Sequence, residues 1–565
     1  MLPGQTTDIG GRIWRVDDWK HPVQLPVDGS GVRARLLSAI EPWRASGQDA
    51  GLSSSLRAGR SISIVGVNRS EGVRVNLWPT NWVCRICRRV TTTQGTCICG
   101  ADSWGQLPFV EFHECGYSGQ PWIPKCATHN QVRVNSPGSS SLRDLKFDCP
   151  ICGKEVQRGM PTWRKCPGCD QPGLSYNVHR AASVFSPLTF TMVNPARPEH
   201  VRDLMANGGT EKSLAWVLSG MPGERPSALP PTRQSMMATF IAQGLSAEIA
   251  SESIDGMVRR GVEFADETGL ANLGIPELHQ EAARASALEI ALATYEGRRS
   301  VTEMPGEPVG KELAQLYSNE YQSTLEAAGL EEIDFVDRFP ILRAVFGYTR
   351  GGGPAGTQRL GTFRGVQDTV RVFADAGETE AYFLRLNPMR VARWLCNKGL
   401  IDSVPTTKRE ARLEILRICE FPARTEDVID ETAGSAVLTL LHSLSHRFIR
   451  QLGILAGVDR ESLAEHALPQ HLGVFVYATP RGEFVLGGLQ SVFETELDRV
   501  LDQLVSAETR CPLDPACDRS GGACLACLHL GEPSCGFYNR FLDRNALFGP
   551  AGYFNVIAAS GARED

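Results

Sequence analysis

Five cysteines lie within a 25-residue stretch near the C-terminal end of the chain. Cys524 and Cys527 form a CxxC step, and two thiolates on one such turn can reach the same zinc ion at ~2.3 Å. Because four sulfurs satisfy one tetrahedral zinc, we expect a site made by Cys517, Cys524, Cys527 and Cys535, with Cys511 as a spare or an alternate ligand.

Two further sets of cysteine pairs lie in the first third of the chain. One set combines a CxxC step with a CxC step, and the other combines two CPxC steps separated by 13 residues. Short knuckles on neighbouring hairpins can surround one zinc ion, as in a zinc ribbon. The spacing therefore predicts two all-cysteine sites, the first from Cys84, Cys87, Cys97 and Cys99 and the second from Cys149, Cys152, Cys166 and Cys169.

Between these sets lie four residues that could make a third, mixed site: His113, Cys115, Cys126 and His129. The alternative is that the two cysteines are small buried hydrophobic residues and the histidines lie on the surface. The all-cysteine sites leave no ligand position for water, so we expect them to be structural rather than catalytic.

A further candidate for metal binding is the pair His442 and His446, at positions i and i+4 of a predicted helix. This spacing can hold a metal, but Ser443 stands where zinc proteases of the HExxH type carry a glutamate. We therefore favour histidines that pack against neighbouring elements or a partner.

The composition is that of a folded globular protein with 17 cysteines among 565 residues. The cysteines cluster in CxxC steps, and neither a secretory signal nor an apolar run long enough for a membrane span is evident. Metal binding is thus favoured over disulfides, and we expect a cytoplasmic protein that has no membrane partner.

The formal net charge of −6 argues against a surface that is basic throughout. Between Leu52 and Thr92, however, arginines outnumber the single acidic residue, Glu71. This segment could contact nucleic-acid phosphates, or it could simply be a solvated face beside a zinc ribbon. The arginines are Arg57, Arg60, Arg69, Arg74, Arg85, Arg88 and Arg89.

The sequence patterns around these residues predict a multidomain α+β protein. We expect N-terminal zinc ribbons, a helical middle and a C-terminal α/β domain that carries a cysteine-rich zinc module. We expect five consecutive parts: an arm with a small β module at 1–77, zinc ribbons at 78–196, a helical domain at 197–330, a mixed α/β linker domain at 331–430 and the C-terminal zinc-binding domain at 431–565.

Alternating apolar residues predict two strands, at 61–67 and 72–77, joined by a turn at Asn68. In the last part we expect a helix at 435–452, a buried strand at 472–479 and a helix at 493–507. Between the strand and the second helix lies the segment 483–490, in which Gly487 and Gly488 allow close backbone approach.

The order of motifs in the last part is specific. A helix with LHSLSH precedes the strand GVFVYAT, the segment VLGGL, a helix and the cysteine cluster that ends in CGFYNRFLDR. This order resembles the C-terminal zinc-binding domain of the MrfA-like superfamily 2 DNA helicases. That domain also occurs in helicase-free proteins, and this chain resembles the DrmB-like proteins of DISARM phage-defence systems.

Other segments carry the same resemblance. Phe346 to Arg350 resembles a Gly-Phe-Thr-Arg segment of that family, and Ala381 to Leu386 resembles its Gly-Ile-Phe-Ile-Arg strand. The run from Leu107 through Cys115 to Trp122 resembles a ribbon segment of the family, with Tyr117 in place of a histidine.

The resemblance implies a non-catalytic zinc-binding subunit that partners a separate superfamily 2 helicase and helps to engage DNA in antiphage defence. The sequence contains no GxxxxGK[ST] motif, which suits a subunit without a motor of its own. A scaffold whose zinc ribbons bind only proteins is an alternative. A zinc-dependent nucleic-acid hydrolase is a third interpretation, and it would need an open zinc at the mixed site or at His442 and His446.

Overall fold

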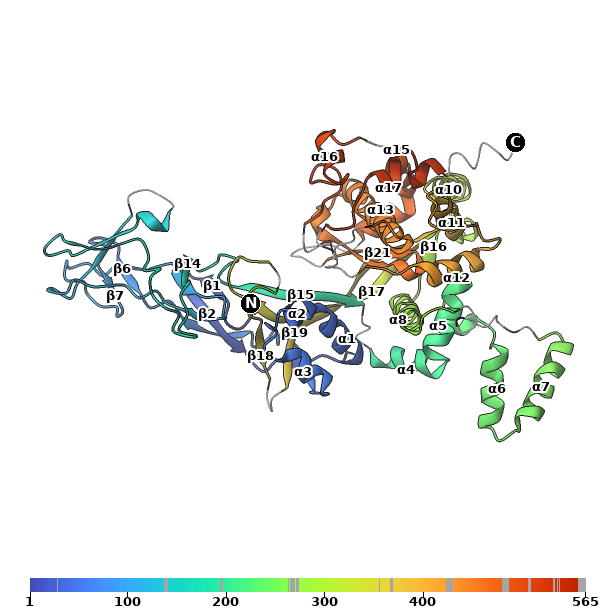
Figure 1. Cartoon of the computed structure of the whole chain (residues 1–565), viewed down its shortest axis with the longest axis horizontal. Coiled ribbons are helices and arrows are strands. Elements are labelled where there is room, and N and C mark those ends of the chain that lie inside the picture. Colours follow the sequence, from blue (N-terminus) through green and yellow to red (C-terminus); the bar gives the residue numbers. More distant parts are fainter. Residues whose placement is uncertain are drawn as a thin grey trace. The chain divides into compact units, whose positions relative to one another are not determined.

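The computed structural model describes the chain except for residues 28, 137–140, 194–196, 263, 265–269, 271–273, 355, 366–368, 423–429, 480–486, 507–509, 532–533, 536, 538 and 557–565. The described residues form a mixed α+β protein with two compact units (Figure 1). The first unit contains Met1–Met192 and Leu342–Ala376, and the second contains Val193–Ile341 and Gly377–Asp565. The multidomain α+β class is confirmed, whereas the five finer boundaries stay a prediction.

Among the described residues, the first unit consists of short strands and three α-helices. Its elements are β1 (Thr6–Ile9), β2 (Arg12–Trp19), β3 (Val23–Gln24), α1 (Gly29–Ala39), α2 (Glu41–Ala45), α3 (Leu52–Arg57), β4 (Ile62–Gly66), β5 (Val73–Leu77), β6 (Trp82–Cys84), β7 (Val90–Thr91), β8 (Trp104–Gln106), β9 (Phe109–Phe112), β10 (Ser118–Gly119), β11 (Arg133–Asn135), β12 (Lys146–Asp148), β13 (Glu155–Arg158), β14 (Ser175–Val178), β15 (Ser186–Val193) and β18 (Gly361–Arg364).

The second unit is richer in helices. Its elements are α4 (Pro198–Ala206), α5 (Gly209–Leu218), α6 (Arg233–Ala242), α7 (Ala247–Arg259), α8 (Glu277–Ala293), β16 (Arg299–Ser300), α9 (Lys311–Gln315), α10 (Tyr321–Ala327), α11 (Pro388–Asn397), α12 (Lys408–Ile418), α13 (Ala433–Leu455), β20 (Leu463–Leu468), β21 (Gly473–Ala478), α14 (Gly488–Thr495), α15 (Leu497–Ser506), α16 (Ala516–Arg519) and α17 (Asn545–Phe548). Two long strands, β17 (Leu330–Thr349) and β19 (Val370–Leu386), contribute residues to both units.

Small antiparallel sheets carry the N-terminal cysteines and histidines. Three of these sheets have three strands each, in the orders β7-β6-β8, β10-β9-β14 and β11-β12-β13. The apolar cluster beneath them is small, with Val83, Leu107, Phe147 and Met160 among its buried members. A core of this size contributes little burial free energy, so bound metal would supply much of the stability of this region.

The strands predicted at 61–67 and 72–77 exist, but they do not form a hairpin. Backbone amides of Glu71 and Gly72 donate to the carbonyl oxygen of Asn68, so the predicted turn is present. However, β4 pairs with β3 and runs parallel to β19, whereas β5 pairs with β2. The alternation identified the strands, but their partners lie outside the segment that the prediction considered.

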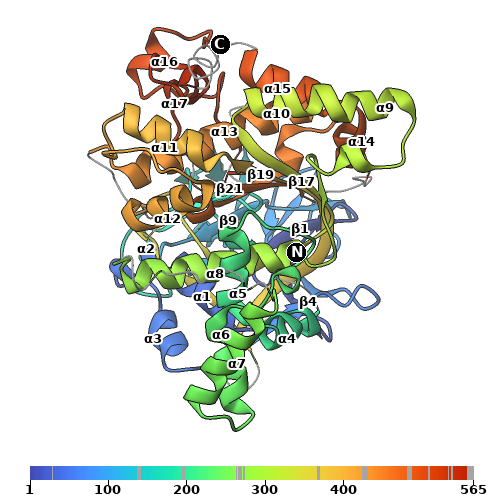
Figure 2. The same cartoon turned by 90° about the vertical axis from the view of Figure 1, so that its right-hand side faces the viewer.

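The second unit buries both faces of the sheet formed by β19, β21 and β20. Tyr382 and Val476 face the cluster that includes α13, and Phe383 and Phe475 face the cluster that includes α8. The rings of Phe383 and Phe475 stack with centroids 4.1 Å apart. Both views show α13 and α8 on opposite sides of β21, so the sheet is sandwiched between two helical layers (Figures 1 and 2).

Helix α13 is the central element of the second unit. It begins with a capping box, in which the side chain of Thr432 accepts from the backbone amide of Ser435 and the Ser435 hydroxyl accepts from that of Thr432. Its 23 residues include His442 and His446, both fully buried. The helix predicted at 435–452 is therefore confirmed, with an additional turn or less at each end.

The chain after β21 differs from the prediction. The helix expected at 493–507 is two helices, α14 and α15, because Glu496 leaves the helical conformation. Residues 483–486 of the segment 483–490 lie outside the described residues, and the last three residues of that segment open α14. Within the part of the chain that the structure describes, no helix has the length and apolarity needed to cross a membrane.

Candidate metal centres

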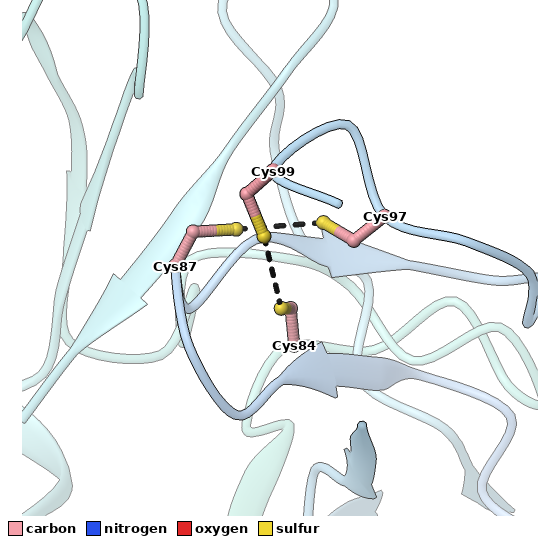
Figure 3. A group of neighbouring side chains, drawn as sticks. All are labelled: Cys84, Cys87, Cys97 and Cys99. Atoms are coloured by element: carbon pink, nitrogen blue, oxygen red, sulfur yellow. Dashed lines mark hydrogen bonds between the residues drawn. The ribbon is translucent and has the colours of Figure 1, made fainter. Parts of the chain in front are cut away.

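The first cysteine cluster brings Cys84, Cys87, Cys97 and Cys99 together at the ends of β6 and the loop before β8 (Figure 3). The Sγ atoms of Cys84 and Cys99 are 3.7 Å apart, and those of Cys87 and Cys97 are 3.5 Å apart. A regular tetrahedron with Zn–S bonds of ~2.3 Å has edges of roughly 3.8 Å. The four thiols therefore fit a tetrahedral zinc, as the sequence predicts for this set.

One backbone turn recurs at four places in the ribbon region. In each turn the backbone amide of a cysteine donates to the carbonyl oxygen of the fifth residue after it. The fourth residue after the cysteine has a left-handed backbone conformation, and its amide donates to the carbonyl oxygen of the cysteine. Such a turn projects the side chains of its first and fourth residues toward the same point. The four turns begin at Cys84, Cys126, Cys149 and Cys166, and their left-handed residues are Arg88, Asn130, Gly153 and Asp170.

A tighter turn occurs twice. The amide of Cys97 donates to the carbonyl oxygen of Ala101, and that of Gly100 donates to Cys97. In the second turn, the amide of His113 donates to the carbonyl oxygen of Tyr117, and the amide of Gly116 donates to that of His113. The segment His113 to Gly116 is thus the counterpart of the CxC segment, with histidine in the first ligand position.

The predicted pairing of the two CPxC steps in one site is wrong. Cys166 and Cys169 lie with His113 and Cys115, whereas Cys149 and Cys152 lie with Cys126 and His129. The Sγ atoms of Cys115 and Cys166 are 3.6 Å apart, and Sγ of Cys149 is 3.5 Å from Nδ1 of His129. The four residues expected to form a third site therefore complete two separate sites.

Strand pairing explains this arrangement. Strand β9 ends directly before His113 and pairs with β14, which follows Cys169, so Phe112 lies opposite Ser175. Strand β11 follows His129 and pairs with β12, which ends before Cys149, so Arg133 lies opposite Asp148. The two CPxC steps consequently belong to different sheets.

The histidine His113 is oriented as a ligand. Its Nε2 lies 3.1 Å from the carbonyl oxygen of Pro172 and donates to it, since that oxygen can only accept. The neutral ring then carries no proton on Nδ1, which lies 3.4 Å from Sγ of Cys169. A hydrogen bond of this kind on the second ring nitrogen is typical of metal-bound histidines. Tyr117 is not a ligand, since its hydroxyl donates to Oε1 of Glu111 at 3.0 Å.

The C-terminal cluster uses a different set of cysteines from the one predicted. Cys511, rather than Cys535, lies with Cys517, Cys524 and Cys527. The Sγ atoms of Cys511 and Cys524 are 3.5 Å apart, and those of Cys517 and Cys527 are 3.7 Å apart.

Two polar contacts help to position Cys511. Its backbone amide donates to the carboxylate of Asp514 at 3.0 Å, and that carboxylate pairs with the guanidinium of Arg544 at 2.9 Å. Cys535 lies elsewhere, with its Sγ 3.3 Å from Nε2 of His442.

Each of the four cysteine-rich clusters contains a thiol with a lowered pKa. Burial opposes the shift at Cys87 and Cys524, but backbone amides two residues later lower the pKa of Cys87 to about 6 and that of Cys524 to about 7. Backbone amides of His129 and Thr128 lower the pKa of Cys126 to about 6, and the amide of Gln171 lowers the pKa of Cys169. Each cluster also contains a thiol with a raised pKa, and burial raises the pKa of both Cys97 and Cys115 to about 12. Thiolates are the form that binds metal, so a bound cation must displace the protons of these remaining thiols.

All four cysteine-rich clusters supply four nitrogen or sulfur donors. Sites of this composition hold zinc with a closed coordination shell and no bound water. The donors suit zinc without excluding other metals that prefer sulfur. The chemical role of these four sites is to hold short loops rigid. The two mixed histidine–cysteine sites have four ligands each, as do the two all-cysteine sites.

The predicted basic segment does not form one patch. Arg57 and Arg60 lie in α3 and the loop after it, whereas Arg85, Arg88 and Arg89 lie next to the cysteines Cys84 and Cys87 of the first cluster. In Figure 1, α3 and the strands β6 and β7 lie at opposite ends of the first unit. Arg74 pairs with Asp17 at 2.5 Å. Arg69 lies in the turn between β4 and β5, and its side chain is exposed.

Comparison with known proteins gives two matches. A family model described as "Domain of unknown function (DUF8724)" matches residues 1–186, about a third of the chain. The chain is also 27% identical over 183 residues to the "DISARM protein DrmB" of Bacillus paralicheniformis. This match covers 30% of the chain and 31% of that protein. The similarity supports a DrmB-like relationship over about a third of each chain, while the MrfA-like C-terminal domain stays a prediction.

Proposed function

We propose that this chain is a non-catalytic zinc-binding subunit of a DISARM-type antiphage complex in the cytoplasm, where it partners a separate superfamily 2 helicase and helps that helicase to engage DNA. The similarity to a DISARM protein carries the proposal. The four cysteine-rich clusters support it, because they fit metal ions that stabilise loops rather than activate water.

The role of zinc in this proposal is structural. The ions would be held by the clusters around Cys84, Cys126, Cys166 and Cys524. When bound, zinc supplies cross-links between loops that have few apolar neighbours. The chain's own residues then present their side chains on loops with little freedom to move, which reduces the entropy lost on binding a partner.

The proposed DNA contact lies at the first cluster. Arg85 and Arg88 are exposed and flank the ligand Cys87. Arg88 occupies the left-handed position of its turn, with φ of 62°, so its backbone is held by the knuckle itself. Arginines on a rigid loop are suited to phosphate contacts, which position a protein on DNA without reading its sequence.

The proposal is tested by recovering the tagged chain from its native host and identifying the bound proteins. We expect a stoichiometric helicase and an ATPase activity that DNA stimulates. Recovery of the chain without a helicase, together with no DNA affinity at low salt, would favour the alternative below.

A protein-interaction scaffold without nucleic-acid binding is the second candidate. It is favoured by apolar side chains at the tips of the cysteine turns: Ile86, Ile98 and Ile151 are 70%, 74% and 55% exposed. Exposed apolar residues on rigid loops are typical of protein contact surfaces. Under this alternative the chain would bind no DNA at low salt, either with its partners or without them.

A further inference from the structure

A fifth group of metal-ligating side chains lies inside the second unit, apart from the cysteine-rich clusters. It consists of His442 and His446 on α13, Glu465 on β20, and Cys535. Their donor atoms all lie within 4.8 Å of one another. Both histidines and the glutamate side chain are fully buried, and Cys535 is 4% exposed. The sequence placed Cys535 in the C-terminal cluster and did not associate Glu465 with any site.

The two histidines present the same ring nitrogen to this group. Nδ1 of His442 lies 3.2 Å from the carbonyl oxygen of Phe541, and Nδ1 of His446 lies 2.9 Å from that of Leu528. A carbonyl oxygen can only accept, so each Nδ1 carries the proton and donates. In a neutral ring, Nε2 is then a bare acceptor. This is the arrangement by which backbone carbonyls orient metal-bound histidines.

Both Nε2 atoms face the same carboxylate oxygen. Oε1 of Glu465 lies 2.8 Å from Nε2 of His442 and 3.3 Å from Nε2 of His446. Two neutral rings would place bare nitrogens against an anionic oxygen, which is repulsive. Without a metal, the contacts would therefore require both rings to be protonated.

A divalent cation between the donors would remove this repulsion while both rings stay neutral, and it would balance the charges of a carboxylate and a thiolate. The case for the cation rests on the convergence of the four donor atoms, which lie within 4.8 Å of one another.

Backbone amides also surround the sulfur of Cys535. Its Sγ accepts hydrogen bonds from the backbone amides of Phe537 at 3.3 Å and Asn539 at 3.2 Å. An amide two residues later donates in the same way to Cys149, Cys166 and Cys511, each of which belongs to a cysteine-rich cluster. Cys535 thus shares the local geometry of the other candidate ligands although no second cysteine is near it.

The carboxylate is held so that one oxygen remains for the cation. The hydroxyl of Ser445, one turn along α13, donates to Oε2 of Glu465. Oε1 is left facing His442 and His446. The donor set is therefore two imidazole nitrogens, one carboxylate oxygen and one sulfur.

We propose that His442, His446, Glu465 and Cys535 bind a divalent transition metal, and that zinc suits this donor set best. The site is closed and structural. It links α13 and β20 to the segment that follows the C-terminal cysteine cluster, and it shares no residue with that cluster. This inference concerns the chain's own residues and does not depend on the proposed partnership with a helicase.

The test is the metal content of the purified full-length chain. We expect five metal ions per chain, one for each group, and the loss of one equivalent in the variant His442→Gln or Cys535→Ser. His471→Gln and Cys419→Ser are matched controls, because His471 and Cys419 are buried but belong to none of the five groups. Both controls should keep five equivalents.

A variant in this buried place could fail to fold, so a second measurement uses the unaltered chain. Diffraction data collected at the absorption edge of the metal would show an anomalous peak between Nε2 of His442 and Sγ of Cys535. Peaks at the cysteine-rich clusters serve as internal standards. If those clusters show peaks and this place shows none, the four side chains form only a hydrogen-bonded network and the inference is overturned.

Discussion

The Sγ atom of Cys115 lies 3.6 Å from that of Cys166, although 51 residues separate them in the chain. This contact joins a tight HxC turn to a CPxC knuckle and assigns each CPxC step to its own site. This assignment predicts how much bound metal two double cysteine variants lose. The pairing suggested by sequence spacing predicts the opposite losses.

The double variant Cys115→Ser, Cys166→Ser should lose one metal equivalent, because both residues serve one site. The double variant Cys149→Ser, Cys166→Ser should lose two, because these residues serve different sites. Metal analysis of the desalted protein measures both, and Cys396→Ser, outside all the groups, is the control. Loss of a single equivalent in the second variant would restore the pairing that the sequence suggested.

Arg350 is a buried arginine whose replacement should destabilise the first unit. Its guanidinium donates to the carbonyl oxygens of Gly116 at 3.1 Å and of Val184, and it lies 5.0 Å from the ring centroid of Tyr348. A lysine ammonium cannot make this forked, stacked arrangement, so Arg350→Lys should lower the free energy of unfolding by about 2–3 kcal/mol. Chemical denaturation measures this.

Arg359→Lys is the control for that change, since Arg359 is an exposed arginine in the same segment. Equal denaturation midpoints for the two variants would show that the fork of Arg350 contributes nothing to stability.

Glu332 should make the stability of the protein depend on pH. Burial and the charge of Asp334 raise the pKa of Glu332 from 4.5 to about 7. Between these values the folded chain holds a proton that the unfolded chain has released, so the free energy of unfolding falls as pH rises through this window. The full effect is about 3 kcal/mol.

The variant Glu332→Gln cannot titrate and serves to isolate this effect. Relative to the variant, the wild-type protein should become progressively less stable from pH 5 to pH 8 in denaturation experiments at several pH values. Parallel curves for the two proteins over this range would be inconsistent with a raised pKa.

The exposed arginines beside the first cluster should contribute to DNA binding. The double variant Arg85→Gln, Arg88→Asn removes two charges, and asparagine tolerates the left-handed backbone at position 88, as Asn130 does in a related turn. The slope of log K against log salt should fall by about 2 in magnitude.

Arg74→Gln is the control, because Arg74 already pairs with Asp17. Filter binding or fluorescence anisotropy at several salt concentrations measures the slopes. An unchanged slope in the double variant would place the DNA contact elsewhere or favour the scaffold.

The sequence predicted most of the candidate ligands, because CxxC and CxC spacings directly reflect the turn that presents two ligands. It could not assign them to sites. Which knuckles meet depends on the pairing of β9 with β14 and of β11 with β12, and these short strands carry no register signal of their own. The segments His113–Gly116 and Cys126–Asn130 do share the spacing of the all-cysteine turns, and that similarity could have revealed their role.

Cys535 shows the limit of proximity in sequence. It lies eight residues after Cys527 but contacts His442, which is 93 residues earlier. Helix α13 was predictable from its capping and apolar content. The contact itself depends on how the C-terminal segment folds over that helix, and Glu465, a glutamate in a buried strand, carried no distinguishing spacing.

The most direct test of the account is the ATPase rate of the helicase partner with DNA, measured with and without this chain. The account predicts that the chain raises the DNA-stimulated rate and that the double variant Cys524→Ser, Cys527→Ser, which breaks the C-terminal cluster, abolishes the increase. The same rate with the chain, without it and with the variant would contradict a zinc-dependent partnership with a helicase.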